Sequence, residues 1–214
     1  MSASGREDDE AGDPGLGRVL AFSDGVFAIA ITLLVLGLNV PRGLSASELR
    51  RSLRQDTLPQ LGIAALSFAV IGLFWLSHRR VFAQVLRIDG MLLLLNLVFL
   101  GPVVLMPFSS QLLSRYGADR VAVACYAATI GLAALLELWI WLHASRRRRL
   151  VAASLSRADV LATAYRAADT AVVFLASIPV SLVSVTAAKY TWLALPVLFR
   201  LRRWIGAGRA EPVG

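Results

Sequence analysis

The chain has 214 residues, of which 57% are hydrophobic and 17% charged, with a formal net charge of +8 and a mean hydropathy of +0.66. The hydrophobic fraction exceeds the roughly 45–50% of soluble domains, and the apolar residues form long uncharged runs of membrane-spanning length. The cations lie between these runs, where orientation signals belong, and no zinc-finger, helix-turn-helix or aromatic-basic pattern indicates nucleic acid as a partner. Composition therefore argues against a soluble or nucleic-acid-binding protein.

Residues that could support catalysis or metal binding are scarce. The chain contains one cysteine, Cys125, and two histidines, so no disulfide can form within it and no cysteine-based metal site can be assembled. It has no paired carboxylates and no metal-ligand spacing, and hydrolases need a nucleophile and a base within hydrogen-bond reach. We predict that the protein is not an enzyme, binds no metal and needs no cofactor.

Three regions are expected along the chain. Residues 1–16 are rich in Gly, Ser and acidic side chains and lack the basic start of a signal peptide, so we predict a disordered acidic tail. Residues 17–205 form a single membrane domain, and residues 206–214 form a short C-terminal tail. The fold class is an all-α integral membrane protein.

The membrane domain is predicted to contain six spanning helices, at 17–40, 58–77, 90–114, 121–143, about 167–188 and about 190–205. The sixth is the weakest, because arginines from position 200 onward shorten it. Sixteen residues at about 1.5 Å each barely cross a hydrocarbon core of about 30 Å. The segment spans only if its arginines snorkel to the interface, and a surface-lying amphipathic helix is the alternative.

Charge sets the expected orientation. With the N-terminus in the cytoplasm, six crossings place 15 of the 22 Lys and Arg residues on the inner side. This bias predicts a multi-pass protein of the cell membrane with both termini in the cytoplasm. The arginine run 146–149 is expected to be an inner anchor, with binding of acidic lipid as a weaker alternative.

The loop at 42–57 is expected to form a short helix on the outer surface. Leu44, Leu49 and Leu53 alternate there with charged residues in an amphipathic pattern. Ser45 or Ser47 could cap this helix.

The first spanning segment opens with polar residues, Arg18, Ser23 and Asp24, before an apolar run. An ionised carboxylate at lipid depth costs at least a few kcal/mol unless it is paired. The carboxylate must therefore face protein or water, so this helix is more than an anchor.

A helical wheel with 100° per residue divides this segment into two faces. One carries Arg18, Phe22, Gly25, Ile29, Thr32, Leu33 and Leu36, and the opposite one carries Asp24, Ala28, Ile31 and Val35. We expect the second face to turn the Asp24 carboxylate into the bundle. From the pattern alone, lipid contact or helix packing is the simpler role for Ile29, Leu33 and Leu36.

The spacing Arg18-x-x-x-Phe22-Ser23-Asp24 and the apolar run that follows it resemble the first helix of the lysosomal potassium channel, transmembrane protein 175, and its prokaryotic relatives. The resemblance covers residues 18 to about 110. It includes Trp75-x-x-His78 in the second segment, and Asn96 followed by Pro107-Phe108 in the third.

This resemblance implies a weakly to moderately potassium-selective cation channel whose pore is lined by the first helix of each subunit. Ile29 would then form the main constriction, with Leu33 and Leu36 one and two turns later. Thr32 takes the place of a polar residue that favours potassium. The implied partners are further copies of the chain, in a homotetramer, and membrane lipids, with K⁺ as the permeant ion. Aliphatic rings can stop ions by dewetting.

Seven residues are expected to form the motif and a network between helices: Arg18, Phe22, Ser23, Asp24, Trp75, His78 and Asn96. We predict a hydrogen-bonded cluster that ties the first three spanning helices together and includes Ser23, Asp24 and His78. A lone His78 at the cytoplasmic interface is the alternative. Arg18 and Asp24 lie on different faces, so pairing between neighbouring helices or subunits stays open.

Two further expectations concern the rest of the bundle. Glu137, near the end of the fourth segment, is expected to snorkel to the interface rather than coordinate an ion. Prolines at 102, 107, 179 and 196 could break helices, as in ion- or proton-coupled transporters, but the inverted repeat typical of those proteins is absent. A transporter and a non-transporting assembly protein remain the alternatives to a channel.

Overall fold

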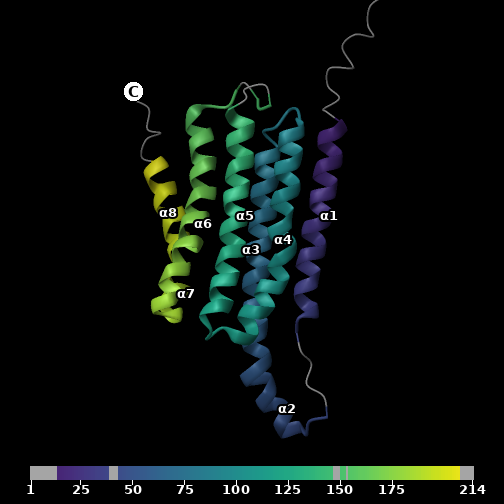
Figure 1. The fold of residues 1–214 in the computed structure, drawn as a ribbon, viewed down its shortest axis with the longest axis vertical. Coiled ribbons are helices and arrows are strands. Elements are labelled where there is room, and N and C mark those ends of the chain that lie inside the picture. The colour runs from purple at the N-terminus through teal and green to yellow at the C-terminus, as the bar shows by residue number, and fades with distance from the viewer. Residues whose placement is uncertain (1–13, 39–42, 147–149, 153, 208–214) are drawn as a thin grey trace, which may run out of the picture.

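The computed structural model describes residues 14–38, 43–146, 150–152 and 154–207, with residues 14 and 203–207 described by their backbone alone. Its helices are α1 (Pro14–Leu36), α2 (Ala46–Ser52), α3 (Leu58–Phe82), α4 (Gly90–Tyr116), α5 (Arg120–Arg146), α6 (Arg157–Val183), α7 (Val185–Thr191) and α8 (Ala194–Ala207). A short π-helical turn, η1 (Leu53–Thr57), joins α2 to α3. The long helices run up and down in one bundle (Figure 1).

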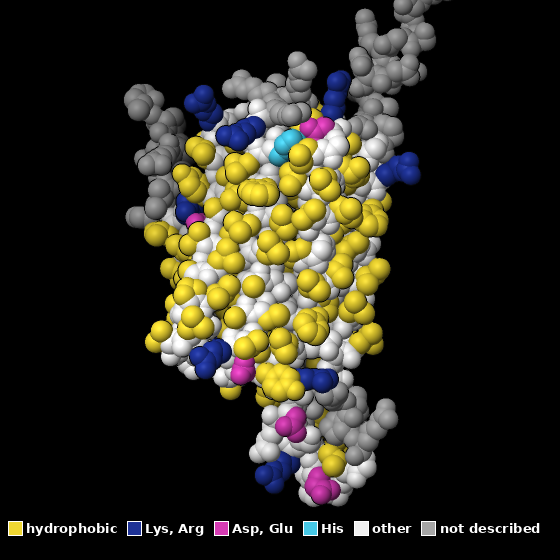
Figure 2. Space-filling model, viewed as in Figure 1, with side chains coloured by type: hydrophobic (Ala, Val, Ile, Leu, Met, Phe, Trp, Pro, Cys, Tyr) yellow, Lys and Arg dark blue, Asp and Glu magenta, His cyan; other side chains and the backbone are white. Residues whose placement is uncertain are grey.

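Five helical stretches in the described part are long and apolar enough to cross a membrane: Gly15–Leu36, Ala46–Phe82, Gly90–Tyr116, Arg120–Arg146 and Arg157–Val183. Hydrophobic side chains cover the middle of the molecule, and the charged ones gather towards its two ends (Figure 2). An apolar band between two charged ends is the surface that a bilayer requires. The prediction of an all-α membrane protein is confirmed.

Three helices begin with a residue whose side chain caps the helix N-terminus. Ser45 caps α2 in a capping box with Glu48, which decides between the two serines proposed for this role. Asp89 caps α4 by accepting from the Leu92 N–H, and Ser156 caps α6. The short amphipathic helix is present, and it projects beyond the bundle at the end opposite the start of α1 (Figure 1).

The core runs between α1, α3, α4, α5 and α6. Phe27, Ile71, Phe99, Tyr126 and Trp141 are among its most deeply buried large side chains. Helix α4 stays continuous through two internal prolines, because neighbouring helices and local adjustments accommodate the lost hydrogen bonds in a membrane bundle.

Several helices begin or end at residues other than the predicted borders of the regions and spanning segments. Helix α1 begins at Pro14, so the expected border between the tail and the membrane domain, at 16/17, falls inside a helix. The remainder of that tail, 1–13, lies outside the described residues. Helix α6 begins at Arg157, about ten residues earlier than expected, because the Ser156 cap starts it and its first turns are polar. Helix α8 extends past the expected border at 205, and residues 208–214 are not described.

The predicted sixth segment, 190–205, is interrupted between α7 and α8. Both short helices lie beside α6, and α8 runs back towards the end where α1 begins (Figure 1). Arg202 donates from Nη2 to Asp169 Oδ1 on α6 at 2.7 Å, and its guanidinium lies 4.5 Å from the Tyr165 ring centre. This arginine is therefore held by α6, in a contact that the sequence analysis did not include.

The expectation for Glu137 is also wrong. The residue is only 4% exposed, and among the described residues no group hydrogen-bonds to its buried Oε1. It lies on the same inner face of α5 as Ala134 and Trp141, which are fully buried. Its place on the helix directs it into the bundle, although its distance from the helix end would allow snorkelling.

Candidate functional site

Helix α1 contacts the rest of the bundle through one narrow face. Ser23, Phe27, Ala30 and Leu34 are buried there, at a spacing of three or four residues that defines one side of a helix. This corrects the face predicted from Asp24, since Val35 in that row is 66% exposed. The helical wheel indicated the side on which the Asp24 carboxylate lies. It did not identify the aromatic and small residues of α1 that pack against the bundle.

A second face of α1 is not covered by any described part of the chain. Ile29 is 61% exposed, Leu33 36% and Leu36 78%, although all three are large aliphatic residues. The Thr32 hydroxyl lies on the same side and donates to the Ile29 carbonyl oxygen at 2.9 Å. The helix therefore presents a row of branched side chains, with one hydroxyl among them, to whatever surrounds the molecule.

A buried chain of hydrogen bonds joins α1, α3 and α4. The Asn96 amide nitrogen donates to Ser23 Oγ at 3.0 Å, and Ser23 donates to the Val19 carbonyl at 2.9 Å. Asn96 Oδ1 lies 2.8 Å from His78 Nε2, and because this oxygen can only accept, Nε2 carries the hydrogen. Ser23, His78 and Asn96 are each almost completely buried, so His78 is not a lone histidine at an interface.

Aromatic rings enclose His78. Its ring stacks on Phe82, with centroids 4.4 Å apart, and on Phe99, at 5.5 Å and an interplanar angle of 9°. Phe27 of α1 lies 5.7 Å away. Among the described residues no group hydrogen-bonds to the buried Nδ1. The sequence patterns did not place these rings around His78, although Phe82 follows it by one helical turn.

Asp24 belongs to a separate contact. It accepts a hydrogen bond from Trp75 Nε1 at 2.7 Å, and its other oxygen lies 3.8 Å from Arg79 Nη1. The Arg79 guanidinium also lies 5.4 Å from the Trp75 ring centre. Trp75 and Arg79 are four residues apart on α3, a spacing that places side chains together, and this spacing could have identified Arg79 from the sequence.

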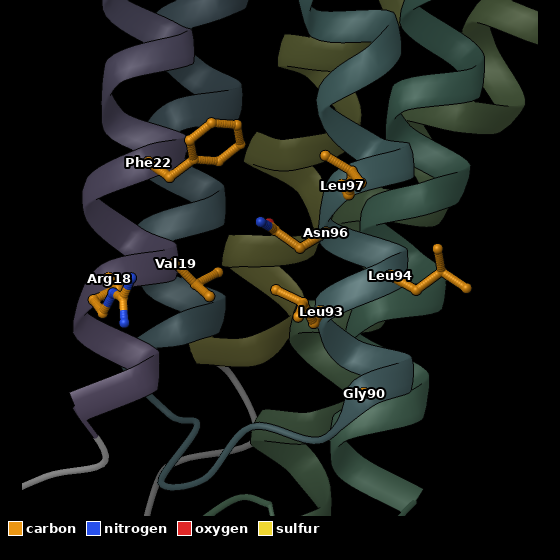
Figure 3. A pocket seen from close by; sticks show the side chains of 8 residues that line it. All are labelled: Arg18, Val19, Phe22, Gly90, Leu93, Leu94, Asn96 and Leu97. Carbon is orange, nitrogen blue, oxygen red and sulfur yellow. The ribbon is translucent and has the colours of Figure 1, made fainter.

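Arg18 and Phe22 lie apart from both clusters, at the edge of a groove between α1 and α4 (Figure 3). Both side chains are exposed, and within the described residues Arg18 and Asp24 form no ion pair. The groove has a volume of about 470 Å³, and its lining includes Val19 and Phe22 of α1 and Leu93, Asn96 and Leu97 of α4.

These contacts hold α1 firmly and fix its rotation, while one of its aliphatic faces stays uncovered. In the described part of the chain, no three His, Cys, Asp or Glu side chains converge as a metal site would require. The fold and the site together define an all-helical integral membrane protein with one anchored helix that presents an apolar row.

Comparison with known proteins identifies the family. A family model described as the endosomal/lysosomal potassium channel TMEM175 matches residues 18–107, which span α1 to α4 and include the buried network. A protein of Chamaesiphon minutus named potassium channel is 36% identical over 196 residues, covering 87% of this chain and 94% of that protein. The crystal structure of a lysosomal potassium-selective channel TMEM175 homolog from Chamaesiphon minutus superposes with a TM-score of 0.76 and 32% identity, covering 89% of this chain and 98% of that one.

Two further relatives match over shorter stretches. A protein of Streptomyces collinus named potassium channel is 40% identical over 138 residues, which cover 63% of this chain and 66% of that protein. The human protein named endosomal/lysosomal proton channel TMEM175 is 36% identical over 137 residues, covering 58% of this chain but only 27% of its own length.

The chain belongs to the TMEM175 family. Members of this family are ion channels, so the predicted family and the prediction that the chain is not an enzyme are both confirmed.

Proposed function

We propose that this protein is a potassium-selective cation channel whose pore is surrounded by α1 from several copies of the chain. The observation that carries the proposal is the uncovered row of Ile29, Leu33 and Leu36 on a helix whose opposite side is fixed to the bundle by Ser23 and Phe27. Relatives that are named potassium channel, one of them aligned over most of its length, support the same conclusion.

The proposed assembly is a homotetramer. Helix α1 occurs once in each chain, so a single bundle cannot enclose a pore with it. Closed rotational symmetry brings the same helix from each subunit to a shared axis. The hydrogen bonds to Ser23 and Asp24 would keep the same face of α1 directed at that axis in every subunit.

The proposed gate is hydrophobic. Rings of Ile29, Leu33 and Leu36 would exclude water and ions when they are close together and admit them when the helices separate. The Thr32 hydroxyl lies beside these rings and could contact a partly dehydrated ion. K⁺ is the permeant ion in this mechanism, and no cofactor takes part.

The proposed location is the cell membrane, with six crossings and both termini in the cytoplasm. In this arrangement α7 and α8 together form the sixth crossing. Two observations support it: α8 returns towards the end of the bundle where α1 begins (Figure 1), and the arginines near this end of α3 fit the positive-inside rule.

Potassium flux from liposomes that contain the purified chain tests the proposal. Ile29→Asn should raise the basal potassium flux and reduce discrimination against sodium, because a ring of polar side chains at the constriction would stay hydrated. Val35→Asn is the matched control, since Val35 is equally exposed but lies on another face of α1. If Ile29→Asn and Val35→Asn conduct alike, the pore assignment is wrong.

Proton conduction is a second candidate, because the human relative is named a proton channel. A pH-sensitive dye inside the same liposomes separates the two activities. Proton entry without potassium flux would replace the first proposal with the second.

The mass of the complex in detergent tests the tetramer directly.

A further inference from the structure

Glu137 is a buried acidic side chain that the proposed pore does not use. It lies well inside α5 and is 4% exposed. The residues one helical turn before and after it on the same side of the helix are buried almost completely: Ala133, Ala134, Ile140 and Trp141. The carboxyl group therefore lies in the apolar core of the bundle, where neither lipid nor bulk water reaches it.

The face of α5 that carries Glu137 is directed towards α3. Tyr126 lies on this face about three turns earlier, and its hydroxyl lies 3.2 Å from Ser67 Oγ of α3. Helix α3 also carries His78, which is bonded to Asn96 and through it to Ser23 of α1. A change at Glu137 is therefore next to the helix that anchors α1.

No described side chain balances a negative charge on Glu137. Its Oε1 has no hydrogen-bond partner in the described part of the chain. The ion pairs that the described residues form involve other carboxylates: Asp24 with Arg79, Asp89 with His143, and Asp169 with Arg202. An isolated ionised carboxylate away from water is very costly, so a carboxyl group in such a site takes up a proton instead.

The ionisable groups on the helices around α5 are engaged elsewhere. On α3, His78 Nε2 is bonded to Asn96, and α4 has no ionisable side chain before Arg115 in its last turn. On α6 and α7, Arg166 donates to the Ala162 carbonyl, Asp169 is paired with Arg202, and Lys189 donates to the Gly117 carbonyl. The environment of Glu137 therefore favours the neutral acid.

We propose that Glu137 is a proton-binding site within each subunit, and that loss of this proton loosens the packing of α5 against α3 and weakens the hold on α1. The ionised carboxylate would draw water or a cation into the core, and the shift of α3 would disturb the bonds from His78 to Asn96 and from Asn96 to Ser23. Alkaline pH should therefore raise the basal ion leak from a site outside the pore row. Proton binding does not depend on the identity of the channel, whereas the effect on leak rests on the proposed function.

Infrared difference spectroscopy of the purified full-length protein in liposomes, between neutral and alkaline pH, tests proton binding. The parent should lose the carbonyl band of a buried protonated acid as the pH rises, and Glu137→Gln should lack this change. Glu48→Gln is the matched control, because Glu48 is an exposed carboxylate on α2, and it should behave like the parent. A band that is unchanged in Glu137→Gln would overturn the proposal.

Glu137→Asp covers the case in which the Gln variant does not fold, because it keeps the acid in the same place. Its protonated-acid band should persist at a shifted frequency, which identifies the residue that carries the proton. An unshifted band in Glu137→Asp would assign the proton to another group and would also overturn the proposal.

Potassium flux from the same liposomes tests the coupling to α1. The leak of the parent and of Glu48→Gln should rise about threefold from neutral to alkaline pH, and the leak of Glu137→Gln should stay at its neutral value. A rise that persists in Glu137→Gln would overturn the coupling. A parent that conducts no potassium at any pH would contradict the proposed channel, and the infrared result would still decide whether Glu137 binds the proton.

Discussion

The Asn96 amide nitrogen donates a buried hydrogen bond to Ser23 Oγ at 3.0 Å, across 73 positions of sequence. This bond sets the rotation of α1, because Ser23 begins the row that packs against the bundle. With Ser23 held inward, Ile29 and Leu33 must lie on an uncovered face. The buried network and the proposed pore surface are therefore two consequences of the same helix orientation.

Replacing Asn96 with Leu should destabilise the protein by about 1–3 kcal/mol, because the His78 Nε2–H then has no acceptor in a buried site. Loss of the bond to Ser23 should also loosen the rotation of α1 and raise basal ion leak in liposomes. Thermal unfolding in detergent measures the first effect. Ser145→Ala, a change at an exposed hydroxyl, should leave the midpoint unchanged. An Asn96→Leu variant as stable as the parent would show that the network does not hold α1.

The two partners of Asp24, Trp75 and Arg79, should differ in how much they contribute to the stability of the protein. The Trp75 hydrogen bond is short, at 2.7 Å, and bonds to charged groups contribute about 1.5–3 kcal/mol. The Arg79 contact is 3.8 Å long, between side chains that are 56% and 39% exposed, and such pairs contribute about 0–1 kcal/mol.

We therefore expect Trp75→Phe to lower the thermal midpoint clearly more than Arg79→Gln does. The measurement is the midpoint in the same detergent at low and at high salt. Only the contribution of Arg79 should weaken with salt, because screening acts on the exposed pair. A larger loss from Arg79→Gln would reverse this ranking.

Much of the bundle follows from the sequence because the physical signals are local. Long uncharged runs locate α1, α3, α4 and α5, since each must satisfy its backbone internally in lipid. Ser23, His78 and Asn96 stand out as polar residues in apolar segments, and polar groups at that depth need partners.

The errors have a common cause. The sequence of a single helix does not determine how that helix is rotated relative to its neighbours. Phe27 turns inward and its ring contacts His78 of α3 and Phe99 of α4. Leu34 is buried as well, whereas Val35, which the wheel placed with Asp24, is exposed. Glu137 is near enough to a helix end to snorkel, but its side chain is buried inside the bundle. Similarly, nothing within the 190–205 segment indicates that Arg202 would pair with Asp169 of α6.

Thr32→Val tests the selectivity proposed for the hydroxyl on the pore face. The substitution keeps the shape of the side chain and removes the donor to the Ile29 carbonyl. If the hydroxyl contacts the permeant ion, the ratio of potassium to sodium flux should fall by about threefold, the scale of one hydrogen bond, with little change in leak. Thr170→Val is the control, because Thr170 makes an equivalent bond to its own helix on α6. An unchanged ratio would remove Thr32 from the selectivity mechanism.

The attachment of α8 should depend on a single arginine. Arg202 contacts both Asp169 and Tyr165 of α6, and an arginine that combines a carboxylate pair with a ring contact is poorly replaced by other residues. Arg202→Gln should therefore increase amide hydrogen exchange across α8, while exchange in α1 and α4 stays as in the parent. Arg200→Gln is the matched control, since it removes the same charge from the same helix two residues away, on a different side. Equal exchange in the two variants would mean that α8 is held by its apolar contacts alone, and the ion pair would then have no part in the sixth crossing.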